Sequence, residues 1–224
     1  MKLLELINEV LDMSKLESGE ILLEEKPFDV YKTINDVMDL VSRQADERGI
    51  KVEQTIEIEH RKLLGSSLYL KRMLMNILSN AVKYNKDYGN IDLSCKEIPS
   101  HSTESTMLEF TCRDTGIGMS SGFKEHVFES FAREQKGGAS KFGGTGLGMT
   151  ITKNLAEKMG GTITFESKEG AGTTFVIRIP FKIDLNSDKR EEKKDVSDGK
   201  SIKGLHILLA EDNELNMEIA EFVL

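Results

Sequence analysis

The order of helical and extended patterns along this chain predicts an α/β (α+β) two-layer sandwich, with one mixed β-sheet, helices on one face of the sheet, and a lid. Apolar residues at helical spacing mark three long segments, and short extended runs lie between and after them. Residues 119–145 form a long, glycine-bearing and mostly irregular segment. Such segments inside a compact domain are usually functional. These observations predict a helix-covered sheet beside a lid over a binding site.

Glycine and proline mark where the successive elements begin and end. Residues 1–16 carry apolar positions three and four apart, which predicts an amphipathic helix that Gly19 ends. A second helix is expected over residues 30–48, with Gly49 as its stop. A later helix over residues 146–159 precedes two glycines. The expected strands cover residues 20–25, 50–58, 62–64, 91–97, 107–113, 162–167 and 173–181.

The helix expected over residues 70–84 carries polar side chains beside its apolar stripe. The stripe consists of Leu70, Leu74, Ile77 and Ala81. Asn76, Asn80, Lys83 and Tyr84 follow at helical spacing, so they line one face at the edge of that stripe. Two amides, a cation and an aromatic ring suit a magnesium ion, a phosphate and a flat base or sugar. Taken alone, an ordinary amphipathic helix with a solvated polar face explains the segment equally well.

Two glycine motifs further along the chain favour a binding site over a solvated polar face. Asp114-Thr115-Gly116-Ile117-Gly118-Met119 sets an acid against a glycine turn, and Gly143-Gly144-Thr145-Gly146-Leu147-Gly148-Met149 opens a helix. The acid can accept a hydrogen bond from an adenine amino group. The glycines let backbone N–H groups approach phosphate without a Cβ in the way. Either motif alone is weak, since glycine-rich runs are often plain loops, but together with the polar helix face they predict a nucleotide pocket.

These motifs resemble those of the catalytic, ATP-binding domain of sensor histidine kinases, in the wider gyrase, chaperone, kinase and MutL superfamily. The resemblance covers about residues 1–181 and rests on five motifs in the family's order. They are an asparagine box at Leu74–Tyr84, glycine boxes at Asp114–Gly118 and Gly144–Gly148, a phenylalanine box at Phe128–Phe131, and a glycine–threonine turn at Gly170–Phe175. The resemblance implies the same sandwich, with ATP between the helices and the lid. Gly65-Ser66 departs from the Gly-Asp that members often carry, which bears on helix capping.

Residue chemistry and the resemblance together assign ATP and Mg²⁺ as cofactors. Asn80 is expected to bind the magnesium ion through its amide oxygen, with Asn76 supporting the site. Lys83 is expected to meet phosphate, and Tyr84 the base or ribose edge, with core packing as the alternative for the tyrosine. Asp114 is the expected adenine contact. The remaining nucleotide contacts are expected from Gly116, Gly118, Gly144, Thr145, Gly146, Leu147, Gly148 and Thr174.

Two of these assignments have an ordinary alternative. Arg133, in Phe131-Ala132-Arg133, matches an arginine that reaches the γ-phosphate in some family members. A guanidinium there would stabilise charge in the transition state. Arg133 is therefore expected to be catalytic, together with Asn76 and Lys83. A solvated charge on the lid explains Arg133 equally well. Thr174 is expected to orient groups behind the pocket, or to be a plain strand residue.

Composition narrows the class of protein. The chain has 224 residues and a formal net charge of −8, which argues against nonspecific binding to nucleic acid. No apolar run approaches the roughly 20 residues of a membrane span, and no secretory signal opens the chain. A cytoplasmic segment without membrane contact is expected, in a full-length protein that can be membrane-anchored. Cys95 and Cys112 match no metal spacing and are expected to be buried, reduced thiols in neighbouring strands.

Four regions are expected along the chain. Residues 1–19 resemble the distal end of a dimerisation and phosphoacceptor hairpin, and residues 20–182 form the catalytic domain. Residues 183–203 are a charged linker. Residues 204–224 resemble the opening of a response-regulator receiver and fall short of the roughly 100 residues of a domain. The implied partners are such a hairpin and a receiver, in a full-length homodimer.

None of the four histidines, His60, His101, His126 and His206, has the helical context of a phosphoacceptor. The first expectation is therefore the catalytic portion of a hybrid histidine kinase that acts on a histidine held elsewhere. The second is an ATP hydrolase of the same superfamily. Those enzymes activate water with a glutamate where this chain has Asn76, and an amide is no general base. The third is a noncatalytic nucleotide-binding sensor module, which the missing histidine leaves open.

Overall fold

The computed structural model describes residues 25–98, 102–134 and 144–186, with single positions between residues 7 and 23. The chain divides into two compact units, residues 1–185 and 186–224. Apart from its first residue, the second unit lies outside the described residues. Of the expected linker, residues 183–186 are described, and Ile183 still belongs to the last strand of the sheet. Residues 187–203 and the expected receiver opening fall outside the described residues and stay predictions.

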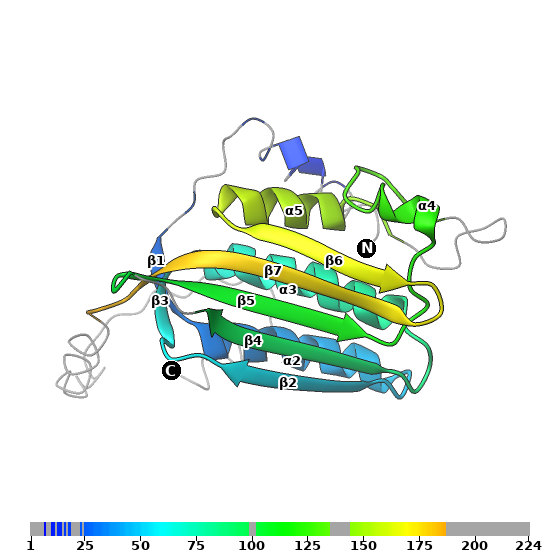
Figure 1. Ribbon diagram of the computed structural model, residues 1–224, viewed down its shortest axis with the longest axis horizontal. Helices are drawn as coiled ribbons and strands as arrows, with labels where there is room; N and C mark the ends of the chain where they lie inside the picture. Colours follow the sequence, from blue (N-terminus) through cyan, green and yellow to red (C-terminus); the bar gives the residue numbers. More distant parts are fainter. Residues whose placement is uncertain are drawn as a thin grey trace, which may run out of the picture. The chain divides into compact units, whose positions relative to one another are not determined.

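A seven-stranded sheet forms the centre of the first unit (Figure 1). Its strands are β1 (Lys26–Asp29), β2 (Lys51–Glu57), β3 (Lys62–Gly65), β4 (Asn90–Ile98), β5 (Ser105–Asp114), β6 (Thr162–Lys168) and β7 (Gly172–Ile183). They lie in the order β1-β3-β7-β5-β4-β2, and β6 pairs with β7 beside this path. Strands β2 and β4 run parallel, and the other ladders are antiparallel. The mixed sheet predicted from the sequence is therefore confirmed.

Three long helices accompany the sheet: α2 (Val30–Asp46), α3 (Ser67–Lys83) and α5 (Gly148–Lys158). Helices α2 and α3 pack together behind the sheet, and α5 packs against α3 and β6 (Figure 1). Side chains cap the first two helices. Asp29 accepts from the N–H of Lys32 at the start of α2, and Ser66 accepts from the N–H of Tyr69 at the start of α3. Ser66 thus supplies the cap that an aspartate would otherwise provide.

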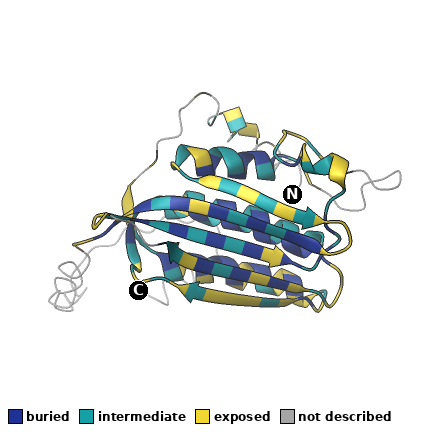
Figure 2. Cartoon of the chain, viewed as in Figure 1, coloured by how far each residue is buried: buried dark blue, intermediate teal, exposed yellow. Residues whose placement is uncertain are grey.

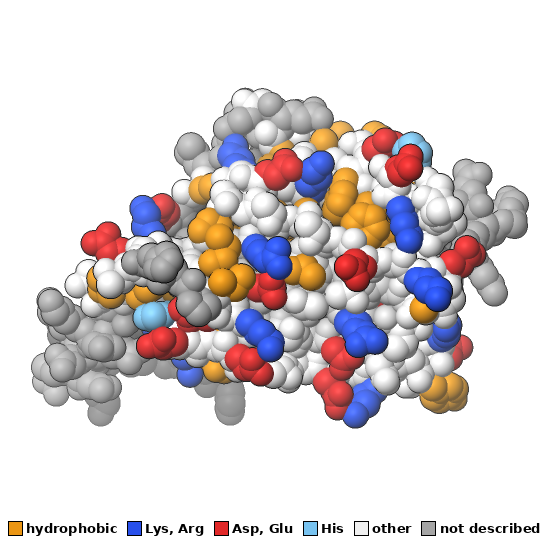
Figure 3. All heavy atoms as spheres, viewed as in Figure 1, with side chains coloured by type: hydrophobic (Ala, Val, Ile, Leu, Met, Phe, Trp, Pro, Cys, Tyr) orange, Lys and Arg blue, Asp and Glu red, His pale blue; other side chains and the backbone are white. Residues whose placement is uncertain are grey.

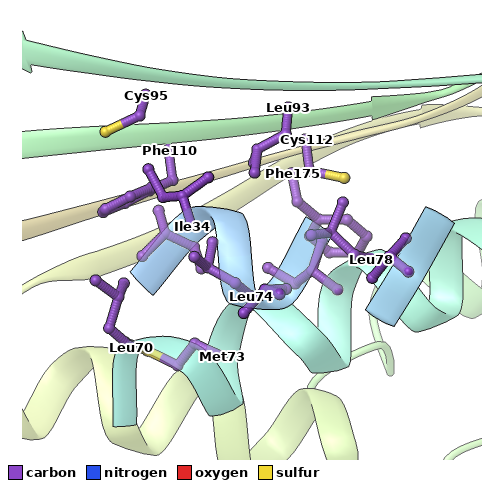
Figure 4. Close-up of a cluster of buried hydrophobic side chains, with 14 of the residues drawn as sticks. Ile34, Leu70, Met73, Leu74, Leu78, Leu93, Cys95, Phe110, Cys112 and Phe175 are labelled. Atoms are coloured by element: carbon purple, nitrogen blue, oxygen red, sulfur yellow. The ribbon is translucent and has the colours of Figure 1, made fainter. Parts of the chain in front are cut away.

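The strands bury alternate side chains against the helices, as the period of an extended chain requires (Figure 2). In β7, Phe175, Ile177, Ile179 and Phe181 are buried. Figure 4 shows Phe175 among other buried hydrophobic side chains of the core, between the sheet and the helices. Cys95 and Cys112 lie in this core as free thiols on neighbouring strands, as predicted. Burial raises the pKa of the Cys95 thiol to about 12.

The other face of the sheet is open and carries interspersed charges of both signs (Figure 3). Arg178 on β7 pairs with Glu109 on β5 at 2.6 Å, and Lys96 on β4 pairs with Glu57 on β2 at 3.1 Å. A polar outer face is usual for a sheet that is covered on one side only. The helix-covered face is therefore the one on which a buried site can form.

Most element boundaries lie within a few residues of the sequence prediction, and two of the differences have a clear local cause. Leu23 and Glu25 are not in a strand, and the first strand is Lys26–Asp29, antiparallel to β3 at the edge of the sheet. Pro27 fits there because a residue without an N–H is tolerated at a sheet edge. Helix α5 begins at Gly148, two residues later than expected, because the glycine turn extends through Leu147.

The N-terminal helix predicted over residues 1–16 is present at its described positions. Met13 and Leu16 pack against the core, and Asn154 Nδ2 on α5 lies 3.8 Å from Met13 Sδ. Ile7, Val10 and Leu11 are exposed. The helix therefore contacts the core of the first unit through Met13 and Leu16.

Candidate nucleotide-binding site

A pocket of about 750 Å³ gathers most of the residues that the sequence singled out. It is bounded by α3, the glycine turn after β5, the described ends of the lid, and the glycine turn before α5. The predicted residues that line it are Asn76, Asn80, Lys83, Tyr84, Asp114, Gly118, Arg133, Gly144, Thr145, Gly146 and Gly148. Motifs that are far apart in the sequence therefore meet around one cavity.

Asp114 ends β5 and is 9% exposed, at the wall of this pocket. Its Oδ1 accepts hydrogen bonds from the N–H groups of Gly116 at 2.8 Å and Thr173 at 3.3 Å. Burial raises the pKa of the carboxyl group, and these two hydrogen bonds oppose that shift. Both bonds end on Oδ1, so within the described part of the chain Oδ2 remains available to accept from a ligand.

The turn that follows Asp114 is fixed by close backbone approach. Gly118 has φ +61° and Gly172 has φ +101°, which favour glycine. A Cβ on Gly118 would collide with the carbonyl of Lys168, and one on Gly172 would collide with the carbonyl of Asp114. The β6–β7 turn therefore packs directly against the first glycine motif and holds the acid in place.

The polar face of α3 borders the pocket, as its spacing predicted. Lys83 Nζ lies 4.5 Å from the centroid of the Tyr84 ring, in a cation–π arrangement. Asn80 lies one turn earlier and presents an amide to the same cavity. An ammonium group, an aromatic ring and an amide group, from three residues of one helix end, thus line the same pocket.

Asn76 also lines the pocket, but its amide is hydrogen-bonded to α5. Its Nδ2 donates to the carbonyl of Gly148 at 3.0 Å and to Thr152 Oγ1 at 3.2 Å. These bonds join the middle of α3 to the first turn of α5. Asn76 therefore orients the N-terminus of α5 toward the pocket.

The second glycine turn brings backbone close to the cavity. Gly144 has φ +144° and Gly146 has φ +79°. A Cβ on Gly146 would lie 2.8 Å from the backbone carbonyl carbon of Phe131, and one on Gly144 would lie 2.7 Å from Lys83 Nζ. Helix α5 then begins at Gly148 without a side-chain cap. The first N–H groups of a helix have no carbonyl partner within the helix itself, and together with the positive end of the dipole they suit an anion.

The described lid residues close one side of the pocket. Phe131 has φ +64°, and its N–H donates to the carbonyl of Gly146 at 3.1 Å. The N–H of Ser120 donates to Glu134 Oε1 at 3.0 Å, near the short helix α4 (Ser121–Lys124). These contacts hold Arg133 at the edge of the cavity. The central lid residues, 135–143, lie outside the described residues.

Three predicted contact residues do not line the pocket. Gly116 instead donates its N–H to Asp114. Leu147 is buried in the core at 1% exposed. Thr174 lies opposite Arg113 and Glu166 in the sheet, on the face away from the buried Thr173 and Phe175, which fits the alternative of a plain strand residue. Thr173 points inward instead, because it shares the face of the buried Phe175.

Several lining residues were missed by the sequence reasoning. Thr173 could have been found from the alternation of β7, since every second residue after it is apolar and buried. The apolar walls come from Ile117, Met119, Phe123, Val127, Met149 and Phe175. Gln44 and Ser79, on neighbouring helices, also border the cavity. No local motif marks these two residues, because only the packing of α2 on α3 brings them there.

A second hollow, of about 590 Å³, lies near the β2–β3 loop and is lined by His60, Glu97 and Thr106 among others. Glu97 accepts from the N–H groups of Glu59 and His60, from Thr106 Oγ1, and pairs with His60 Nδ1 at 2.6 Å. Burial alone would raise the pKa of Glu97, but these hydrogen bonds lower it to about 2. The carboxylate is thus satisfied internally and braces the β2–β3 loop.

In the part of the chain that the structure describes, no cluster of three His, Cys, Asp or Glu residues could hold a metal ion. Over the same residues, no helix combines the length and apolar character needed to cross a bilayer. A metal in the main pocket would therefore depend on amide oxygen, water and a ligand.

Comparison with known proteins agrees with this geometry. The family of histidine kinase-, DNA gyrase B-, and HSP90-like ATPases matches residues 65–183. The signal transduction histidine-protein kinase BarA of Escherichia coli K12 is 35% identical over 185 residues, which is 82% of this chain and 20% of BarA. The autoinducer 2 sensor kinase/phosphatase LuxQ of Vibrio parahaemolyticus is 29% identical over 96% of this chain and 25% of LuxQ.

Solved structures agree as well. ShkA, crystallised in full length in complex with AMPPNP, superposes with a TM-score of 0.70 at 28% identity, over 81% of this chain and 36% of ShkA. The mycobacterial sensor histidine kinase MprB gives a TM-score of 0.58 at 25% identity, over 71% of this chain and 99% of the solved MprB chain.

The fold and the pocket are those of a nucleotide-binding ATPase domain. The chain belongs to the family of histidine kinase-, DNA gyrase B-, and HSP90-like ATPases, and its matched relatives are sensor histidine kinases. The resemblance seen in the sequence is thereby confirmed. The chain spans only 20% and 25% of the lengths of BarA and LuxQ.

Proposed function

We propose that the pocket binds ATP with Mg²⁺, and that the chain is the catalytic portion of a hybrid sensor histidine kinase. The γ-phosphate would pass to a histidine outside this chain. The observation that carries the proposal is one pocket with the buried carboxylate of Asp114 on one wall and Lys83 and the start of α5 on another. The names of the relatives and the AMPPNP complex of ShkA support the same ligand class.

The adenine base would lie at the Asp114 wall. Asp114 Oδ2 would accept a hydrogen bond from the adenine amino group, and the apolar side chains of Ile117, Met119 and Phe175 would flank the ring. Guanine presents a carbonyl at that position, so two acceptors would face each other. Such an unsatisfied pair costs roughly 1–3 kcal/mol. The pocket should therefore prefer ATP to GTP.

The phosphates would lie between Lys83 and the second glycine turn. The N–H groups at Gly144–Gly148 and the positive end of α5 suit their negative charge. The residues fit a magnesium ion that is bound mainly by phosphate and water, since Asn80 offers a hard amide oxygen. When bound, the ion would neutralise charge on the phosphates. Arg133, at the pocket edge, would stabilise further charge on the γ-phosphate.

The expected partners rest on the resemblance of residues 1–19 and 204–224 and on the relatives' being sensor histidine kinases. A dimerisation hairpin would present its histidine to the γ-phosphate, and a receiver would accept the phosphoryl group next. The full-length protein would be a homodimer whose catalytic portion is cytoplasmic. Within the described residues, His60 and His126 are engaged with Glu97 and Glu129.

The test is a transfer assay with radiolabelled ATP. The chain alone should take up no acid-labile label, whereas a separate dimerisation hairpin from a related kinase should be labelled slowly, since positioning carries most of the rate. The same hairpin with its histidine changed to alanine is the control. Nucleotide binding without transfer to any hairpin would favour the noncatalytic alternative.

ATP hydrolysis by the unmodified chain should stay near background. The side chain at the position of the water-activating glutamate is Asn76, whose amide is bound to Gly148 and Thr152 and cannot act as a base. Phosphate release should be measured for the chain and for Asn76→Glu. Robust turnover by the unmodified chain would instead identify an ATP hydrolase.

A further inference from the structure

A guanidinium outside the pocket holds one of its walls in place. Arg48 follows the C-terminus of α2 and its side chain is 29% exposed. It reaches the end of α3, where Nη1 donates to the carbonyls of Val82 at 2.6 Å and Lys83 at 3.3 Å. Nη2 donates to the carbonyl of Asn85 at 2.8 Å. Nε and Nη2 also bind Asp87 Oδ1 at 2.9 and 2.8 Å.

These partners explain why an arginine suits this position. The last carbonyls of a helix have no intrahelical donors, and they form the negative end of the helix dipole. A guanidinium is always charged and offers five donors in a fixed fork, so Arg48 can satisfy several carbonyls and a carboxylate at once. A lysine ammonium is a point charge and could hold fewer of them.

The end of α3 that Arg48 binds carries ligand-facing side chains. Lys83 and Tyr84 both line the pocket. The carbonyl of Tyr84 accepts from the N–H of Ile117 at 3.0 Å, in the glycine turn after Asp114. The next residue, Asn85, is buried and its Oδ1 accepts from Thr115 Oγ1 at 3.2 Å. A shift of this helix end would therefore move Lys83 relative to the glycine turns.

We propose that Arg48 is a positioning residue for the nucleotide site. It acts through the Lys83–Tyr84 end of α3, and it fixes the backbone of Lys83 relative to the phosphate-facing turn at Gly144. This inference rests on the proposed nucleotide binding. Asp114 is held directly by Gly116 and Thr173, and Arg48 reaches the turn after Asp114 indirectly, through the carbonyl of Tyr84 and the side chain of Asn85. Arg48 should therefore matter for the phosphates more than for the base.

The ligands for the test are adenosine and AMPPNP with Mg²⁺, measured by calorimetry well below the melting temperature of each variant. Arg48→Met should weaken AMPPNP binding about tenfold or more and adenosine binding less than about threefold. Arg48→Lys keeps the charge and should recover part of the loss for AMPPNP. The matched control is Arg61→Met, since Arg61 pairs with Asp29 at 2.7 Å away from the pocket.

The outcomes separate this inference from the proposed function. If the unmodified chain binds neither ligand, the nucleotide site is wrong and Arg48 has no site to position. If it binds both, equal losses for adenosine and AMPPNP in Arg48→Met would show a general loss of structure and overturn the positioning role. Unchanged AMPPNP binding, or a loss no larger than in Arg61→Met, would do the same. Should Arg48→Met fail to fold, the ratio of the two losses in Arg48→Lys decides.

Discussion

The two ends of the pocket are built differently. At the base end, where we propose that adenine binds, Asp114 sits on a sheet strand and neighbouring backbone N–H groups hold its carboxylate. At the phosphate end, where we propose that the phosphates bind, Lys83 ends a helix and its Nζ lies beside Gly144. The base end is therefore fixed by backbone packed on backbone. The phosphate end depends on a long side chain and on elements that tertiary contacts bring together.

This difference predicts which substitutions the site can tolerate. A new atom at the base end meets a carbonyl oxygen of the sheet, which cannot move without disturbing a ladder. A new atom at Gly144 meets the tip of a lysine, which can take another rotamer, whereas one at Gly146 meets the backbone of Phe131. A substitution at Gly172 should therefore cost more than one at Gly144, and should affect ligands without phosphate as well.

The largest effect is expected from Asp114→Asn. The amide keeps the shape of the side chain but removes the charge and can turn a donor toward the adenine amino group. Affinity for ATP should fall about 10- to 100-fold, which corresponds to roughly 1–3 kcal/mol. The preference for ATP over GTP should shrink in the same variant. Competition of ATP and of GTP against a labelled ATP analogue measures this preference. An unchanged preference in Asp114→Asn would contradict the proposed contact between Asp114 and adenine.

The next effect compares two glycines of the β6–β7 turn. Gly170 and Gly172 both have positive φ, but a Cβ on Gly170 meets nothing, whereas one on Gly172 collides with the carbonyl of Asp114. Gly170→Ala should cost about 1 kcal/mol of stability from backbone strain alone. Gly172→Ala should cost more and also weaken adenosine binding about tenfold. Thermal melts and calorimetry on both variants test this; equal effects would mean that the contact with Asp114 is unimportant.

A smaller effect is expected at the phosphate end. In Gly144→Ala the new Cβ would lie 2.7 Å from Lys83 Nζ, and the side chain can give way. Affinity for AMPPNP should fall by about three- to tenfold, since φ +144° is also strained for alanine. Adenosine binding should not change. A parallel loss for adenosine would show that the two ends are not separable.

The smallest effect is a pH dependence confined to the base end. Burial raises the pKa of Asp114 above its ordinary value of 3.8, so the folded chain holds this proton more tightly than the unfolded chain. The contribution of Asp114 to the free energy of unfolding therefore falls as pH rises through the interval just above 3.8. Adenosine needs the ionised carboxylate, so its affinity should weaken as pH falls toward that interval. Adenosine affinity in Asp114→Asn should not change with pH over the same range. The same pH profile in the variant and in the unmodified chain would contradict this role of the carboxylate.

The sequence by itself determined much of this architecture. Helical spacing placed Asn76, Asn80, Lys83 and Tyr84 on one face, and it was correct because the period of a helix is fixed by its own hydrogen bonds. Glycine marked the turns at Gly144 and Gly146, where positive φ excludes most other residues. Local geometry is enough for these features, so local sequence reveals them.

Other features were decided only by the tertiary structure. The order of the strands, with β7 beside β3, β5 and β6, depends on ladders between segments far apart in the chain. Which residue of β5 lies beside Thr173 depends on the register of β7 against β5, in which Asp114 lies opposite Thr173. The contact of Arg48 with the end of α3 joins elements that the sequence separates. No local pattern encodes such contacts, because packing between distant elements chooses their partners.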